Sequence, residues 1–290
     1  MDATRETTAL RAVLDAAAAG WRLDRAAALV WPELGLRGRR RRIEAGGLAV
    51  NGRRQGPAYK VRAGDVLTAV PLAALEAVFS PADIAIVPAG PDYAALVKPG
   101  GLHSASLGPT GGASLEAMLP ALFPDRPAWL LSRLDGLTSG LVPVAFSAAA
   151  AAAYRRLEDA GQVGKTYLAV VHGRVEAPFV VARELDVADR ATTRVLARDA
   201  ADPLRRTAVE PVRRLDGVTL VACRIAKGAR HQIRAHLAAA GHPIVGDPRY
   251  GRGEGERLFL HCAGIASPVV AVTCAPLWRP EDAAVVAAKT

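Results

Sequence analysis

The sequence predicts an α+β fold with a mainly antiparallel sheet, preceded by a small α/β domain. After residue 84, short apolar runs outnumber helical patterns and do not alternate with them, as a doubly wound fold would require. Before that point, residues 21–70 carry eleven Lys or Arg residues against four acids, which is most of the net charge of +9. A chain of 290 residues can bury one large core or two smaller ones.

Composition and charge narrow the class of protein. No apolar run approaches the roughly 20 residues of a membrane span. The N-terminus mixes charges into its apolar residues, unlike a secretory signal. Three widely spaced cysteines, Cys223, Cys262 and Cys274, are typical of a reducing compartment rather than of a disulfide framework. We therefore expect a cytoplasmic protein without membrane partners and, in the absence of a heptad pattern or large apolar stripe, a monomer.

The N-terminal quarter is predicted as an extension followed by a compact module. Residues 1–20 are expected to form a short helical extension. Residues 21–72 then follow the order helix, basic helix and hairpin, because apolar residues first recur at helical spacing and later alternate. Asn51 and Gly52 lie between two short extended runs, which is the strongest short-range signal for a β-hairpin. A second turn is expected at residues 63–65.

The module is strongly basic, and a concentrated positive field attracts a polyanion. A charge run alone is as often a solvated surface. The segment resembles the small RNA-binding module first named for the "S-four" protein of the ribosomal small subunit. The matching residues are Arg22-Leu23-Asp24, the basic helix, Gly47 with Val50-Asn51-Gly52, and Val61 with Gly64-Asp65. The resemblance implies that the hairpin and the basic helix dock on folded RNA, with the run Arg39, Arg40, Arg41 and Arg42 at the phosphates.

Residues 73–83 are predicted to be a linker and residues 84–280 a second domain. Ser147 can cap a helix over residues 147–160, and a second helix is expected over residues 231–240. Pro143 falls inside a predicted strand, which indicates an edge strand or a bulge there. The predicted strands are 84–87, 93–97, 141–146, 167–172, 209–213, 218–225 and 258–263.

Four polar stretches of this domain can carry chemistry. The sharpest is RLDGLTSG (133–140), a polar loop with two glycines that can hold a carboxylate in a cleft wall. Asp135 in that loop could equally close a local turn. The other stretches are KTYLA (165–169), HQIRAHL (231–237) and GHPIVGDPRYG (241–251).

With KPGGL (98–102) before them and LFLH (258–261) after them, these stretches resemble the motifs of RluA-type RNA pseudouridine synthases in order and spacing. The resemblance covers residues 84–265. It implies a mainly antiparallel mixed sheet of the pseudouridine synthase type and a cofactor-free isomerase that converts uridine to pseudouridine. Without CxxC or HExxH spacing, no metal site is expected.

The resemblance also implies roles for matching residues. Asp135 aligns with the catalytic aspartate, Arg234 with the arginine that pairs with it, and Tyr167 with the tyrosine that packs on the target base. A guanidinium at 234 could hold both oxygens of Asp135 through a rigid fork. Arg133 aligns with the residue that fills the gap left by a flipped-out uridine. Lys165, His231 and Gln232 are expected to contact the substrate.

Three stretches depart from the family pattern, and in one of them Val97-Lys98-Pro99-Gly100-Gly101 stands where Asn-Lys-Pro-Ala-Gly is usual. Ser132 stands where His is usual before Arg-Leu-Asp. Gly228-Ala229-Arg230 stands where Gly-Arg-Thr is usual, so the first arginine is missing or moved by one position. The changes at Ser132 and Ala229 favour a non-catalytic RNA-binding or ribosome-assembly factor. The presence of Asp135, Tyr167 and Arg234 favours an enzyme. A nucleoside hydrolase would leave the basic module unexplained. We therefore predict a site-specific synthase acting on structured RNA, with ribosomal RNA preferred over transfer RNA.

Overall fold

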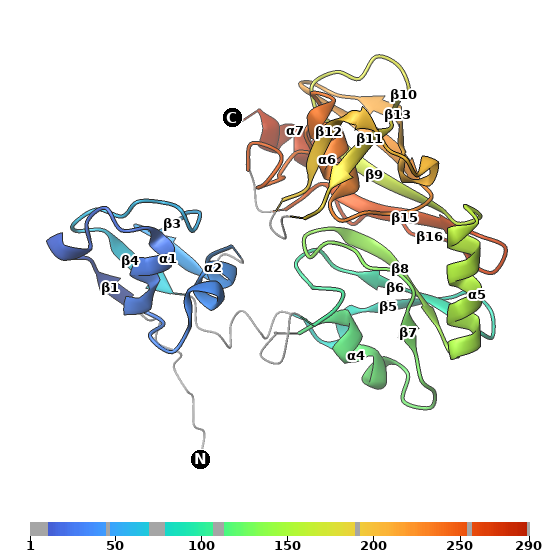
Figure 1. The fold of residues 1–290 in the computed structure, drawn as a ribbon, viewed down its shortest axis with the longest axis horizontal. Coiled ribbons are helices and arrows are strands. Elements are labelled where there is room, and N and C mark those ends of the chain that lie inside the picture. The colour runs from blue at the N-terminus through green and yellow to red at the C-terminus, as the bar shows by residue number, and fades with distance from the viewer. Residues whose placement is uncertain are drawn as a thin grey trace. The chain divides into compact units, whose positions relative to one another are not determined.

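The computed structural model describes residues 11–44, 47–69, 79–106, 113–188, 192–253 and 257–288. The chain divides into two compact units, Met1–Val78 and Phe79–Thr290, which are described separately (Figure 1). Residues 73–78 of the predicted linker lie outside the described residues.

The first unit is a four-stranded antiparallel sheet in the order β1-β4-β2-β3 with two short helices. Its core includes Leu23, Leu48 and Leu67, which are fully buried. Its elements are β1 (Arg11–Val13), the 3₁₀ turn η1 (Ala16–Ala18), α1 (Leu23–Ala26), the 3₁₀ turn η2 (Ala27–Leu29), α2 (Leu36–Glu44), β2 (Leu48–Val50), β3 (Arg53–Arg54) and β4 (Val66–Ala69).

The expected helical extension over residues 1–20 is wrong for the part that the structure describes. Residues Arg11–Val13 form β1, which pairs antiparallel with β4. Only Ala16–Ala18 form a short 3₁₀ turn, with the Asp15 side chain accepting a hydrogen bond from the Ala18 amide. Alanine-rich sequence favours helix locally, but an available sheet edge offers this backbone a ladder of partners, and tertiary pairing overrides propensity. The first ten residues lie outside the described residues.

The hairpin predicted at Asn51 and Gly52 is confirmed. Both residues have positive φ, 50° and 76°, as a type I′ turn between β2 and β3 requires. The Asn51 side-chain Nδ2 donates to Asp65 Oδ1 at 2.8 Å, and its side-chain Oδ1 accepts from the Val66 backbone amide at 2.8 Å. Asp65 in turn accepts from the Arg62 amide at 2.8 Å. The asparagine and the aspartate of the motif therefore tie the two turns of the unit together.

The second unit is built on a ten-stranded, mainly antiparallel sheet, which confirms the predicted α+β class. The main order is β10-β13-β14-β9-β15-β8-β6-β5, with β7 added to β8 and β16 to β15. A separate ribbon pairs β11 with β12. The strands are β5 (Ala85–Pro88), β6 (Tyr93–Lys98), β7 (Trp129–Leu130), β8 (Ser139–Ala145), β9 (Gly164–His172), β10 (Phe179–Val181), β11 (Arg183–Asp186), β12 (Arg194–Asp199), β13 (Thr207–Arg214), β14 (Val218–Ile225), β15 (Leu260–Ala266) and β16 (Ala271–Thr273).

Two halves of this sheet meet where β8 and β15 pair in parallel. The pairing consists of Ser139 with His261 and Gly140 with Cys262. On one side of this seam lie β5 to β8, and on the other lie β9 and the later strands. The seam matters for function because the RLDGLTSG loop leads directly into β8.

Helices and short 3₁₀ turns complete the unit. Ser147 caps α5 as predicted, its hydroxyl accepting from the Ala150 amide, and Tyr154 of that helix is fully buried. The elements are η3 (Pro81–Asp83), α4 (Leu115–Leu122), α5 (Ala148–Asp159), η4 (Pro203–Arg205), α6 (Gln232–Ala239) and α7 (Pro280–Ala287). Helix α5 packs against β8, α6 against β12 and β13, and α7 against β9 and β14 (Figure 1).

Pro143 does not mark an edge strand or a bulge, contrary to the sequence prediction. It lies within β8 in regular register with Ala95 of β6. Its carbonyl accepts from the Leu131 amide at 2.9 Å, on the side away from β6. Because the nitrogen and carbonyl of one strand residue point to the same side, the missing N–H costs the β6 ladder nothing.

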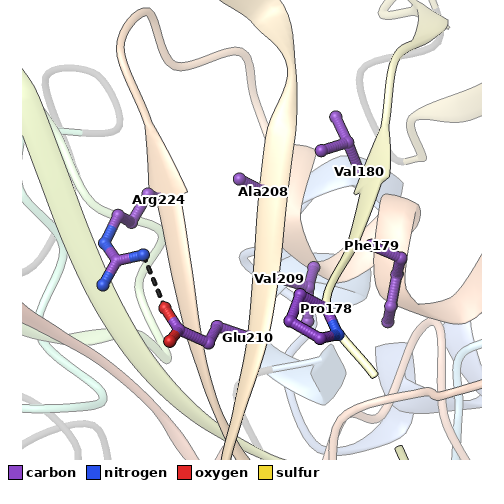
Figure 2. A pocket seen from close by; sticks show the side chains of 7 residues that line it. All are labelled: Pro178, Phe179, Val180, Ala208, Val209, Glu210 and Arg224. Carbon is purple, nitrogen blue, oxygen red and sulfur yellow. Dashed lines mark hydrogen bonds and ion pairs between the residues drawn. The ribbon is translucent and has the colours of Figure 1, made fainter. Parts of the chain in front are cut away.

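One shallow hollow lies on β10, β13 and β14 and is lined by none of the motif residues. Figure 2 shows the side chains that line it. Among these side chains, the Arg224 guanidinium donates to the Glu210 carboxylate at 2.7 Å. The lining residues are Pro178, Phe179, Val180, Ala208, Val209, Glu210 and Arg224. Among the described residues, no helix is long and apolar enough to cross a bilayer, and no group of three or more acidic, Cys or His side chains could hold a metal ion.

Candidate active site

The loop between β7 and β8 presents Asp135. Ser104 fixes this loop from the side, since its hydroxyl accepts from the Leu134 amide and donates to the Leu134 carbonyl, both at 2.9 Å. Thr138 closes the turn by donating its amide proton to the Asp135 carbonyl at 3.0 Å. The Asp135 side chain stays 21% exposed, so a bound nucleotide can reach its carboxylate.

Lys98 lies beneath the loop and is fully buried. Its ammonium group donates to the carbonyls of Leu102 at 2.7 Å, Pro99 at 2.9 Å and Gly136 at 3.1 Å. Burial lowers the pKa of Lys98 to about 7, and the nearby Asp135 opposes that shift. The KPGGL motif was identified in the sequence without a role for Lys98. A lysine at the end of an otherwise apolar strand is nevertheless a signal that its ammonium group has buried hydrogen-bond partners.

Helix α6 brings Arg234 to Asp135. Ile233 and Leu237 are buried one helical turn apart and fix the rotation of the helix, as the sequence predicts. Arg234 is 4% exposed, and its Nη1 donates to Asp135 Oδ2 at 3.3 Å. The helix therefore holds a buried cation against the partly exposed carboxylate.

The fork of Arg234, however, is not on Asp135. Its Nε donates to Asp247 Oδ2 at 2.7 Å and its Nη2 to Asp247 Oδ1 at 2.8 Å. Asp247 is fully buried and also accepts from the amides of Arg249 and Tyr250 at 2.9 and 3.1 Å. Burial opposes ionisation of Asp247, but these hydrogen bonds outweigh it and hold its pKa below the ordinary value. Asp247 was missed because the sequence does not show which acid a buried guanidinium selects.

His231 and Tyr250 lie on the other side of Asp135. His231 Nε2 is 3.8 Å from Asp135 Oδ1, and His231 Nδ1 is 2.9 Å from the Tyr250 hydroxyl. Burial lowers the pKa of His231 to about 4; Asp135 opposes the shift, while Arg234, Arg249 and Arg230 add to it. The ring is therefore neutral near pH 7.

Tyr167 is supplied by β9, opposite Cys262 of β15. Its side chain is almost completely buried. Burial, with a further contribution from its hydrogen bond to the Cys262 thiol, raises the pKa of Tyr167 well above 10. The phenol is consequently neutral at physiological pH and is a hydrogen-bond donor and packing surface.

The other predicted substrate contacts differ in accessibility. The Arg133 side chain is exposed beside Ser132 on the rim of a shallow hollow. Lys165 is buried and forms an ion pair with Glu158. The Gln232 amide is buried and donates to the carbonyls of Arg205 and Arg206, both at 3.2 Å. Lys165 and Gln232 thus have internal partners, and their contact with substrate stays a prediction.

In the first unit, part of the arginine run also has internal partners. Arg40 donates to the buried Asp24 at 2.6 Å. Arg42 lies over the Trp31 ring, 5.2 Å from its centroid, and pairs with Glu33 at 3.7 Å. Arg39 is half-buried, and the Arg41 side chain lies outside the described residues.

Comparison with known proteins agrees with the geometry. A family model described as RNA pseudouridylate synthase matches residues 92–239. Ribosomal large subunit pseudouridine synthase D of Xanthomonas campestris pv. campestris is 32% identical over 251 residues, covering 83% of this chain and 74% of the relative. Ribosomal large subunit pseudouridine synthase C of Escherichia coli is 32% identical over 258 residues, covering 77% of each chain.

The fold comparison gives the same family. The human protein RNA Pseudouridylate Synthase Domain Containing 1 matches with a TM-score of 0.59 at 25% identity, covering 70% of this chain and 87% of that structure. Human RNA Pseudouridylate Synthase Domain Containing 4 matches with a TM-score of 0.57 at 20% identity, covering 70% of this chain and 92% of that structure, and shares the fold. The chain therefore belongs to the RNA pseudouridylate synthase family, as an RluA-type isomerase that converts uridine in RNA to pseudouridine.

Proposed function

We propose that this synthase acts on structured ribosomal RNA in the cytoplasm, with residues 84–280 performing catalysis and residues 21–72 binding RNA. Asp135 is the catalytic residue, Arg234 holds it, and Tyr167 packs on the target base. The observation that carries the assignment is the contact between Arg234 and the partly exposed Asp135 carboxylate, 99 residues apart in the chain.

The reaction is an isomerisation, so its atoms balance within the nucleotide. The bond between N1 and C1′ breaks, the uracil rotates, and a bond forms between C5 and C1′. The C5 proton leaves and N1 gains a proton. The Asp135 carboxylate can add to the sugar or to the base, or stabilise charge while a ribose proton leaves. The exposed face of Asp135 is compatible with each of these routes.

Ribosomal RNA is favoured over transfer RNA on two grounds. The relatives from Xanthomonas campestris pv. campestris and Escherichia coli are both named as synthases of the ribosomal large subunit. The first of these matches 83% of the chain, more than residues 79–290 alone contribute, so the similarity reaches into the basic unit. A basic appended domain suits a large folded RNA. We expect the protein to act as a monomer.

The test maps pseudouridine across total RNA by carbodiimide-dependent reverse transcription, in cells with the gene, without it, and with Asp135→Asn. We expect one or more stops in ribosomal RNA that require the wild-type gene. Stops lost only from transfer RNA would favour the alternative substrate. Unchanged maps in all three strains would favour a non-catalytic RNA-binding or ribosome-assembly factor.

A further inference from the structure

Asp135 has one oxygen that Arg234 does not reach. Because the guanidinium fork is committed to Asp247, Arg234 offers Asp135 only Nη1, at 3.3 Å from Oδ2. Oδ1 faces His231 Nε2 at 3.8 Å. A carboxylate held at one oxygen can rotate about its Cβ–Cγ bond. Its orientation therefore depends on a second group, and His231 lies where that group is needed.

The contacts of Tyr250 favour one position of the His231 proton. The Thr193 amide donates to the Tyr250 hydroxyl at 2.7 Å, so the oxygen is an acceptor there. One acceptor site of the oxygen is thereby used, and the hydroxyl proton is available to His231 Nδ1, 2.9 Å away. With Nδ1 accepting, the single proton of the neutral ring lies on Nε2. The opposite tautomer would direct a lone pair at the Asp135 oxygen.

The surroundings of His231 keep this state. Its side chain is 13% exposed, and the charged groups that face it are Asp135 and the cations Arg230, Arg234 and Arg249. Three cations against one carboxylate disfavour a further positive charge on the ring. His231 also has a left-handed backbone, φ 55°, immediately before α6. This conformation is strained for a non-glycine residue, and such strain concentrates at functional sites.

We propose that His231 is a positioning residue that orients Asp135 through a neutral Nε2–H donor, and that Tyr250 and Thr193 hold it in this tautomer. This role replaces the substrate contact expected from the sequence and rests on Asp135 being catalytic. The 3.8 Å separation needs to shorten by about 1 Å or less to become a hydrogen bond, and catalytic hydrogen bonds commonly tighten when substrate binds.

The test compares His231→Leu with His231→Gln in single-turnover and steady-state assays. The substrate is an RNA fragment that contains the unmodified target uridine. The Leu variant should lower kcat about tenfold or more with KM unchanged, because a misaimed reacting group is costly. The Gln variant, whose amide keeps an N–H donor, should restore most of that loss. Tyr250→Phe should give an intermediate loss, whereas the matched control Tyr93→Phe, whose hydroxyl donates to the Ala150 carbonyl at 3.0 Å, should not change kcat.

A normal kcat in His231→Leu, a defect confined to KM, or equal loss in the Gln and Leu variants would overturn the proposal. If the Leu variant does not fold, histidine-selective ¹⁵N NMR of the wild type tests the proposal. The His231 signals are assigned by their loss in His231→Gln, and a ring protonated at Nδ1 would contradict the proposal. Turnover in Asp135→Asn would instead refute the catalytic role of Asp135. An inactive Asp135→Asn beside a fully active His231→Leu refutes the positioning role alone.

Discussion

Each unit contains a cluster of aspartate and arginine, but the two clusters have opposite stoichiometry. In the first unit one buried carboxylate, Asp24, accepts from two arginines, Arg40 at 2.6 Å and Arg22 at 3.3 Å. In the second unit one buried guanidinium, Arg234, serves two carboxylates. The first cluster has a surplus of cations, and the second has a surplus of anions.

The difference explains why only one of these aspartates is suited to chemistry. Asp24 is 2% exposed and fully engaged, so it ties α1 to α2. In the second cluster Asp247 takes the fork, and Asp135 keeps one longer contact and 21% exposure. A shared cation therefore leaves one carboxylate stabilised yet accessible. The same residue types form a structural tie in one unit and a candidate catalytic centre in the other.

The largest expected effect comes from removing the charge of the accessible carboxylate. Asp135→Asn should lower turnover to below about 1% of wild type, because an amide of the same shape is neither an anionic nucleophile nor a base. Folding and RNA affinity should be nearly unchanged. Turnover and filter binding with the same RNA fragment measure both, and activity above that level would contradict the assignment.

Arg234→Lys should come next, with a turnover loss of at least roughly tenfold. A lysine cannot reproduce the fork to Asp247 and reach Asp135 at the same time, since an ammonium is a point charge on a flexible stem. The thermal midpoint should also fall, because Asp247 is buried and loses part of its compensation. A defect in RNA affinity alone, with normal turnover at saturation, would show that Arg234 serves the RNA instead.

Asp24→Asn should affect stability without affecting chemistry. We expect a loss of about 1.5–3 kcal/mol in the unfolding free energy of the first unit, the range for hydrogen bonds to charged groups. Burial raises the pKa of Asp24, but Arg40 and Arg22 outweigh it and hold the pKa below the ordinary 3.8. The stabilisation is thus present at neutral pH and disappears as pH falls below about 4.

Urea unfolding at pH 7 and pH 3 checks this expectation, with the exposed Glu44→Gln as control. The difference between wild type and Asp24→Asn should shrink at pH 3, while turnover on a short RNA fragment stays at the wild-type level. An equal difference at both pH values would mean that the charge of Asp24 is not what stabilises the unit.

The smallest effect is expected from arginines that can be replaced without breaking these ties. Arg37→Ala with Arg39→Ala should lower the slope of log affinity against log salt by about 0.7–0.9 for each lost phosphate contact. Arg40 and Arg42 are left intact because they hold Asp24 and Trp31. An unchanged slope would identify these two arginines as solvated surface residues, not RNA contacts.

Local patterns predicted local features well. The Asn51-Gly52 hairpin follows from the positive φ that its turn requires. The spacing of Ile233 and Leu237 predicted which side of α6 carries Arg234. The strand over Val218–Ile225 has the predicted limits because its mainly apolar run is bounded by turns.

Features that depend on distant partners could not be predicted. Residues Arg11–Val13 form a strand only because they pair with β4, 53 or more positions away in the chain. No local sequence pattern indicates that pairing. The choice of Asp247 over Asp135 for the Arg234 fork depends on how the 241–251 loop folds back on α6. Lys98 bonds to a carbonyl of the Asp135 loop, and Cys262 lies opposite Tyr167, only because the fold brings these distant segments together.

The seam between β8 and β15 has a consequence for how the enzyme gains its activity. Asp135 lies in the loop that leads into β8, whereas Tyr167 on β9 and Arg234 on α6 lie in the chain between β8 and β15. Ser139 and His261, which meet there, are 122 positions apart and share a side-chain hydrogen bond. Closing so long a loop carries an entropic cost that only the completed sheet can offset. Turnover therefore reports on folding across the whole second unit, because Asp135 precedes β8 whereas Tyr167 and Arg234 follow it.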